Sequence, residues 1–156
     1  MTAECATFLA GSLEKEENEM ESERFYRGVF YAGGGWNFLM SIPMTFLVSS
    51  LPTMIQIDPP RYPIFVYFNL MTVCLFGCIQ ILVARNLSSS RSLVKILIWS
   101  KMLTVVVFVA GLFFLAMPPN LTNFLLPGMI IDLIFGVLFW RYLFFSSKSP
   151  NTGTQV

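Results

Sequence analysis

The sequence predicts an all-α protein, a four-helix transmembrane bundle with up-down topology. Hydrophobic residues make up 55% of the 156 residues and charged residues only 12%, about half the charged share of a soluble domain. The mean hydropathy is +0.67, so a soluble core of this size cannot hide most of the apolar side chains. Four apolar stretches each supply the roughly 20 residues that a helix needs to cross a bilayer. We expect these helices at residues 25–51, 63–84, 93–117 and 122–145.

The connections between the stretches contain the residues that end and begin helices. Pro52 is expected to end the first helix, and the proline-rich segment 58–63 leads into the second, where proline is tolerated in a first turn. Ser92 and Thr122 are candidate N-caps of the third and fourth helices. All the connections are short, so consecutive helices are expected to run antiparallel.

The two ends of the chain are polar. Residues 1–24 crowd six glutamates into positions 14–23, which favours a disordered, solvated tail or a fraying helix. Met20 is a reasonable start of translation, and we hypothesise that the residues before it are an over-extended start. An intact mass beginning at Thr2 would exclude this. Residues 146–156 are expected to form a polar C-terminal tail.

The distribution of basic residues predicts the orientation. The N-terminal tail, the second connection and the C-terminal tail lie on one face of the membrane, and the opposite face carries only Arg61. The first face holds Lys15, Arg24, Arg27, Arg85, Arg91, Lys95, Arg141 and Lys148. Because cytoplasmic loops are enriched in Lys and Arg, both termini are expected in the cytoplasm. The expected location is the cell membrane, which is the inner membrane if the source is bacterial.

Polar side chains inside the membrane are the candidates for function, because such groups are expensive to keep there. Asn37, Gln80, Lys101 and Asp132 come from four different helices and fall in the cytoplasmic half, whereas Asn69 is nearer the other side and alone. Lys101 and Asp132 have opposite charge on neighbouring antiparallel helices, so we expect them to pair. The pair is either a register-setting ion pair or part of a proton relay or headgroup site, and the first interpretation is favoured.

Helix one contains an unusual run of glycines. Gly33, Gly34 and Gly35 precede Trp36 and Asn37, and small residues let two helix backbones approach closely. The favoured interpretation is close helix packing with Asn37 bonding across an interface. The alternative is a small pocket lined by Trp36 and Asn37. Pro43 removes the backbone hydrogen bond to the carbonyl of Leu39, which predicts a kink.

The sequence lacks the residues that several kinds of chemistry require. The chain has no histidine, which excludes an imidazole general base and a His-bearing zinc site. Cys74 and Cys78 are not spaced as a redox pair and are expected to pack as apolar residues. A net charge of +1 gives no basic field for nucleic acid. We therefore expect no catalytic residue, no metal and no cofactor.

Particular segments resemble a group of small, uncharacterised bacterial four-helix membrane proteins. They include Gly34–Leu39 and Pro43, the proline-rich stretch Pro59–Phe65, and the intramembrane residues Lys101 and Asp132. The general layout is also loosely similar to DoxX-like proteins. The resemblance implies the four-helix fold and the importance of Lys101 and Asp132, and it implies no activity. Ser100 stands where the group usually has a glycine.

The sequence favours a non-enzymatic integral membrane protein, an accessory or interaction subunit in the lipid bilayer. It would work as a homo-oligomer or within a larger membrane complex. The second hypothesis is a small oligomeric transporter or proton-linked carrier that uses Lys101 and Asp132. The third is a lipid-modifying membrane enzyme, for which that pair would be the only available acid–base set.

Overall fold

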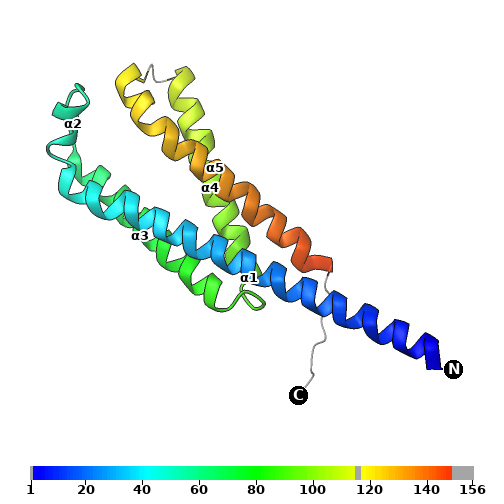
Figure 1. The fold of residues 1–156 in the computed structure, drawn as a ribbon. Coiled ribbons are helices and arrows are strands. Elements are labelled where there is room, and N and C mark those ends of the chain that lie inside the picture. The colour runs from blue at the N-terminus through cyan, green and yellow to red at the C-terminus, as the bar shows by residue number, and fades with distance from the viewer. Residues whose placement is uncertain (1, 115–116, 149–156) are drawn as a thin grey trace.

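The protein is built from helices, as the sequence predicts. The computed structural model describes residues 2–114 and 117–148, and within these ranges there is no strand. The helices are α1 (Thr2–Leu47), α2 (Leu51–Met54), α3 (Pro63–Arg85), α4 (Arg91–Phe114) and α5 (Pro119–Lys148) (Figure 1). Three segments, α3, α4 and residues 119–145 of α5, are long and apolar enough to cross a membrane. They indicate a multi-pass membrane protein.

Two antiparallel helix pairs make up the fold. α1 packs mainly along α3, and α4 packs mainly along α5, whereas contacts between the two pairs are few. Figure 1 shows the pairs meeting near the α3–α4 connection and diverging toward α2 and the α4–α5 connection. We call the first region the closed end and the second the splayed end. The N-terminal part of α1 and the C-terminal part of α5 extend from the closed end.

The buried core lies at the closed end, where all four long helices contribute to it. Phe30 of α1 and Phe139 of α5 are fully buried and stack with ring centroids 4.5 Å apart. Tyr142 of α5 donates a hydrogen bond of 2.8 Å from its hydroxyl to the carbonyl of Leu87 in the α3–α4 connection. The aromatic rings and this hydrogen bond join the two pairs at this end.

The N-terminal segment differs from its predicted state. The structure continues α1 without interruption from Thr2, so over residues 2–24 the helical alternative is observed in place of a disordered tail. Glutamate, lysine, alanine and leucine are all good helix formers, and their propensity outweighs the expected charge repulsion. Where side chains are described, Arg27 pairs with Glu23 one turn earlier at 2.8 Å, which supports the helix.

The ends of the helices also differ from their predicted positions. α1 ends at Leu47 instead of residue 51, and Pro52 lies in the first turn of the short helix α2 instead of ending α1. α1 continues through Pro43, and the kink expected there stays a prediction. α5 extends to Lys148, into the predicted polar tail. The rest of that tail, residues 149–156, lies outside the described residues.

Neither predicted N-cap occupies a cap position. α4 begins at Arg91, so Ser92 lies inside it, and the carbonyl of Ser90 accepts the hydrogen bond from the Val94 amide at 3.0 Å. α5 begins at Pro119, and the Thr122 amide donates to the carbonyl of Pro118 at 3.0 Å. The serine-rich connection and the proline pair each start their helix earlier than the apolar pattern predicts. α4 ends at Phe114, short of the predicted residue 117, and residues 115–116 lie outside the described part.

Candidate functional site

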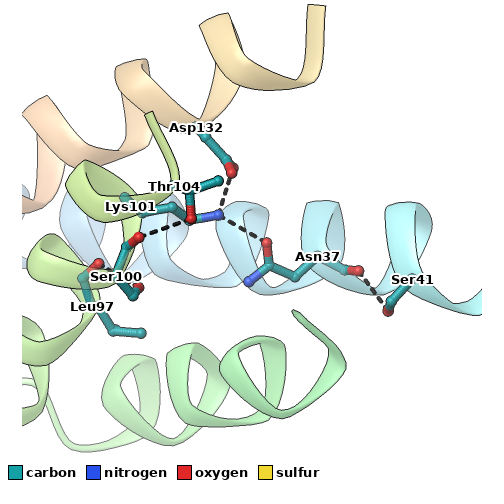
Figure 2. Close-up of polar contacts among 7 residues, drawn as sticks. All are labelled: Asn37, Ser41, Leu97, Ser100, Lys101, Thr104 and Asp132. Carbon is teal, nitrogen blue, oxygen red and sulfur yellow. Dashed lines mark hydrogen bonds and ion pairs between the residues drawn. The ribbon is translucent and has the colours of Figure 1, made fainter. Parts of the chain in front are cut away.

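A buried polar contact joins three helices at the centre of the molecule. The Nζ atom of Lys101 on α4 lies 2.5 Å from Oδ1 of Asp132 on α5 and donates a hydrogen bond of 3.0 Å to Oδ1 of Asn37 on α1. Figure 2 shows the lysine ammonium between the other two side chains. The expected pairing of Lys101 with Asp132 is therefore present, and Asn37 is its third member. We call these three residues the polar triad.

The members of the triad differ in exposure. Asn37 and Lys101 are buried, whereas the Asp132 side chain keeps 18% of its surface exposed. A buried charge is tolerated when it is paired and hydrogen-bonded. The contacts of Lys101 meet both conditions. Because α1 belongs to one helix pair and α4 and α5 to the other, the triad also links the two pairs.

Hydroxyl groups near the triad bond to their own helices. Ser41 donates to the carbonyl of Asn37 at 2.7 Å, and Ser100 donates to the carbonyl of Leu97 at 2.8 Å. Thr104 donates to the carbonyl of Ser100 at 2.9 Å (Figure 2). Hydroxyls bonded to the preceding turn are satisfied locally. They leave Lys101 with Asn37 and Asp132 as its partners.

A groove separates the two helix pairs on the splayed side of the triad. Its volume is about 510 Å³, and its walls come from α1, α2, α3 and α5 together with the α2–α3 connection. Trp36, Asn37 and Asp132 are among the lining residues, so the pocket considered for Trp36 and Asn37 does form. Its walls are mostly apolar, with methionine, leucine and valine side chains. The polar triad therefore contacts the groove through Asn37 and Asp132.

Gln80 is not part of the triad, although the sequence groups it with these residues. It is fully buried, and neither atom of its side-chain amide has a hydrogen-bond partner within the described part of the chain. A Cβ placed on Gly33 would lie 2.8 Å from its Oε1 and 3.3 Å from Phe139. Gln80 is therefore enclosed at the closed end, where an unpaired amide is energetically unfavourable.

The glycine run contains two packing positions and one open position. A Cβ on Gly34 would lie 3.0 Å from the carbonyl oxygen of Gly77, and a Cβ on Gly77 would lie 3.2 Å from the carbonyl oxygen of Gly34. The backbones of α1 and α3 thus touch where these glycines meet. Gly33 packs against Gln80, but nothing lies within 4 Å of a Cβ on Gly35. The packing role predicted for Gly35 is therefore wrong, because it faces away from α3.

The groove also includes Asn69, which the sequence sets apart from the other polar candidates, and Asp58, which the sequence does not single out. Asn69 of α3, which the sequence places alone, lines the same groove as Asn37 and Asp132. Asp58 in the α2–α3 connection also lines it. Sequence position gives a depth for Asn69 but no sign that α3 and α5 enclose a common space. The only available signal is that Asn69 is a polar residue within an apolar helix.

Comparison of the chain with protein-family models, with curated proteins and with solved structures finds no match. The polar triad and the groove are therefore the features from which a function can be inferred.

Proposed function

We propose that α1 is a fourth membrane span and that both termini are cytoplasmic. The part of α1 from Phe25 to Leu47 runs antiparallel beside α3 and is roughly 35 Å long at the α-helical rise. Its glycines, Asn37 and Pro43 make it less apolar than its neighbours. The closed end carries the clustered basic residues and the splayed end carries Arg61, which favours a cytoplasmic closed end.

The function proposed on this architecture is binding: a non-enzymatic accessory or interaction protein that uses the groove as its binding surface. The observation that carries the proposal is the groove itself, about 510 Å³ in volume with a buried polar contact at one end. Specific ligand sites are typically apolar cavities of about 300–1,000 Å³ with a few placed polar groups. Asp132 is already engaged by Lys101, which argues for an anchoring carboxylate over a catalytic one.

Photocrosslinking at neighbouring positions of α5 tests this proposal. A benzophenone amino acid at Leu125, which lines the groove, is expected to give a discrete adduct in native membranes. The same amino acid at Leu126, which is 43% exposed and is not a groove residue, is the matched control. Mass spectrometry of the adducts distinguishes a lipid, a second copy of the chain and another protein. Indistinguishable adducts at both positions would contradict a binding role for the groove.

A carrier is the second candidate, and the burial of Gln80 favours it. The groove lies on one side of the triad, and the Gln80 amide, which has no hydrogen-bond partner among the residues that the structure describes, lies at the closed end. If the two helix pairs rocked, the closed end would open. The Gln80 amide could then hydrogen-bond to water or to a substrate. Such a motion is the usual basis of alternating access. Flux into reconstituted vesicles that disappears with Asp132→Asn would favour the carrier over the binding protein.

A further inference from the structure

The groove changes in character along its length. It extends from Trp36 of α1 to Val48, just after that helix, and from Leu121 to Asp132 along α5, a length of roughly 17 Å at the helical rise. One end of the groove is lined by Asn37 and Asp132 of the polar triad. At the far end, Leu51 and Pro52 of α2 and Ile55 and Ile57 of the following connection supply apolar walls, and the exposed Asp58 of the same connection also lines the groove. Because the Asp132 side chain is largely buried whereas Asp58 is exposed, a long occupant is expected to place its polar group at the triad.

The volume of the groove matches a small ligand. The groove has a volume of about 510 Å³. This volume lies within the usual range for a small ligand. In a bilayer, the long apolar molecules of that size are lipids and single-chain amphiphiles.

The charge of the triad limits the polar group that fits. Lys101 and Asp132 together are neutral, and the described groove residues include the carboxylates of Asp58 and Asp132 and the amides of Asn37 and Asn69 but no lysine or arginine. The Oδ1 atom of Asn37 already accepts from Lys101, so its free amide group is a donor. Asp132 is hydrogen-bonded through Oδ1 to Lys101, and its side chain is 18% exposed at the groove. A neutral donor can bond to the Asp132 carboxylate without disturbing the pair, whereas at the triad a cation would compete with Lys101 and a phosphate would be repelled.

We propose that the groove binds a neutral membrane amphiphile, a single hydrocarbon or isoprenoid chain that ends in a hydroxyl group. The hydroxyl donates to Asp132, and the chain lies along the groove toward α2. This inference rests on the proposed function in taking the groove as the binding surface, and it adds the class and the orientation of the ligand.

Quenching of Trp36 fluorescence by brominated probes tests the proposal in detergent-solubilised protein. Trp99 and Trp140, which are 75% and 54% exposed, are changed to phenylalanine so that Trp36 alone emits. The probes are a straight-chain alcohol brominated near its hydroxyl, its isomer brominated at the far end, the matching bromoalkane and the matching bromoalkyl-trimethylammonium. The first alcohol is expected to quench best and to bind about tenfold tighter than the alkane, the effect of one hydrogen bond to a charged acceptor.

Two sets of variants locate the site. Gly128 lines the groove, and a Cβ there would meet only the end of Met40 at 3.9 Å, so Gly128→Leu is expected to fill the space and abolish quenching. Gly35→Leu, on the open face of α1, is the matched control and is expected to leave quenching unchanged. Lys101→Met combined with Asp132→Leu removes the acceptor without leaving a lone charge, and is expected to make the alcohol bind no better than the alkane.

The outcomes separate the two proposals. If the probes quench Trp36 equally in Gly128→Leu and Gly35→Leu, they are only partitioning into detergent. Both proposals, the groove as the binding surface and the class of its ligand, are then wrong. If Gly128→Leu abolishes quenching but the alkane or the ammonium probe binds as well as the alcohol, the groove binds and the proposed ligand class is wrong. Stronger quenching by the alcohol brominated at its far end would overturn the orientation.

Discussion

Lys101→Met is expected to lower the melting temperature of the detergent-solubilised protein by about 10 °C. Breaking a buried ion pair by removing one partner typically costs about 3–5 kcal/mol, and each kcal/mol corresponds to a few degrees in a chain of this size. The change leaves the Asp132 carboxylate without its cation and removes the donor to Asn37. Lys95→Met is the matched control, because Lys95 is exposed on the same helix. Its melting temperature is expected to be close to that of the wild type.

Asp132→Asn is expected to destabilise as well, because it leaves the buried Lys101 ammonium with amide acceptors only. Combining Lys101→Met with Asp132→Asn is expected to recover much of the loss, since neither charge is then left unpaired. The charge swap Lys101→Asp with Asp132→Lys provides a second test of the pairing. Single variants as stable as the wild type would show that the charges are not a structural pair. That result would favour the carrier as the function.

Gly34→Leu is expected to disrupt the packing of α1 on α3 and to lower the free energy of unfolding by about 3 kcal/mol or more. Overpacking a close contact costs roughly 1–3 kcal/mol for modest additions. Here the new side chain would start 3.0 Å from both the Gly77 carbonyl oxygen and a side-chain carbon of Ile81. A backbone oxygen cannot move aside as a flexible side chain can.

Gly35→Leu is the control for this change, since it makes the same substitution one residue further along the helix. With nothing within 4 Å of its Cβ, it is expected to leave the melting temperature unchanged or to raise it slightly, because leucine has a better helix propensity than glycine. Thermal unfolding of both variants in one detergent makes the comparison. Equal destabilisation by the two would contradict the assigned contact between Gly34 and Gly77.

Features that depend on one helix, or on two neighbouring helices, could be predicted from the sequence. Apolar length predicts α3, α4 and α5, and opposite charges on antiparallel neighbours predict the pairing of Lys101 with Asp132. Helix ends are less predictable, because apolar patterning does not report where backbone hydrogen bonding stops. For the acidic segment, charge repulsion and helix propensity point in opposite directions, and the sequence offers no measure of which is larger.

The rest of the site depends on rotation and on tertiary geometry. Asn37 and Gln80 are both amides in the half that the sequence predicts to be cytoplasmic, but only Asn37 reaches Lys101, because the rotation of each helix decides which side chain faces α4. The same rotation separates Gly34 from Gly35, since successive residues point about 100° apart. The groove, with Asn69 in its wall, arises from the divergence of two helix pairs and leaves no periodic pattern in the sequence.

The central claim is that α1 crosses the membrane, so that the groove lies toward the non-cytoplasmic side of the polar triad. Single cysteines at Glu21, Gln56 and Ser89, in a variant without the native cysteines, test it by labelling intact cells with a membrane-impermeant thiol reagent. With four spans, Gln56→Cys is labelled in intact cells, whereas Glu21→Cys and Ser89→Cys are labelled only after permeabilisation. Labelling of Glu21→Cys together with Gln56→Cys in intact cells would show three spans and contradict this architecture.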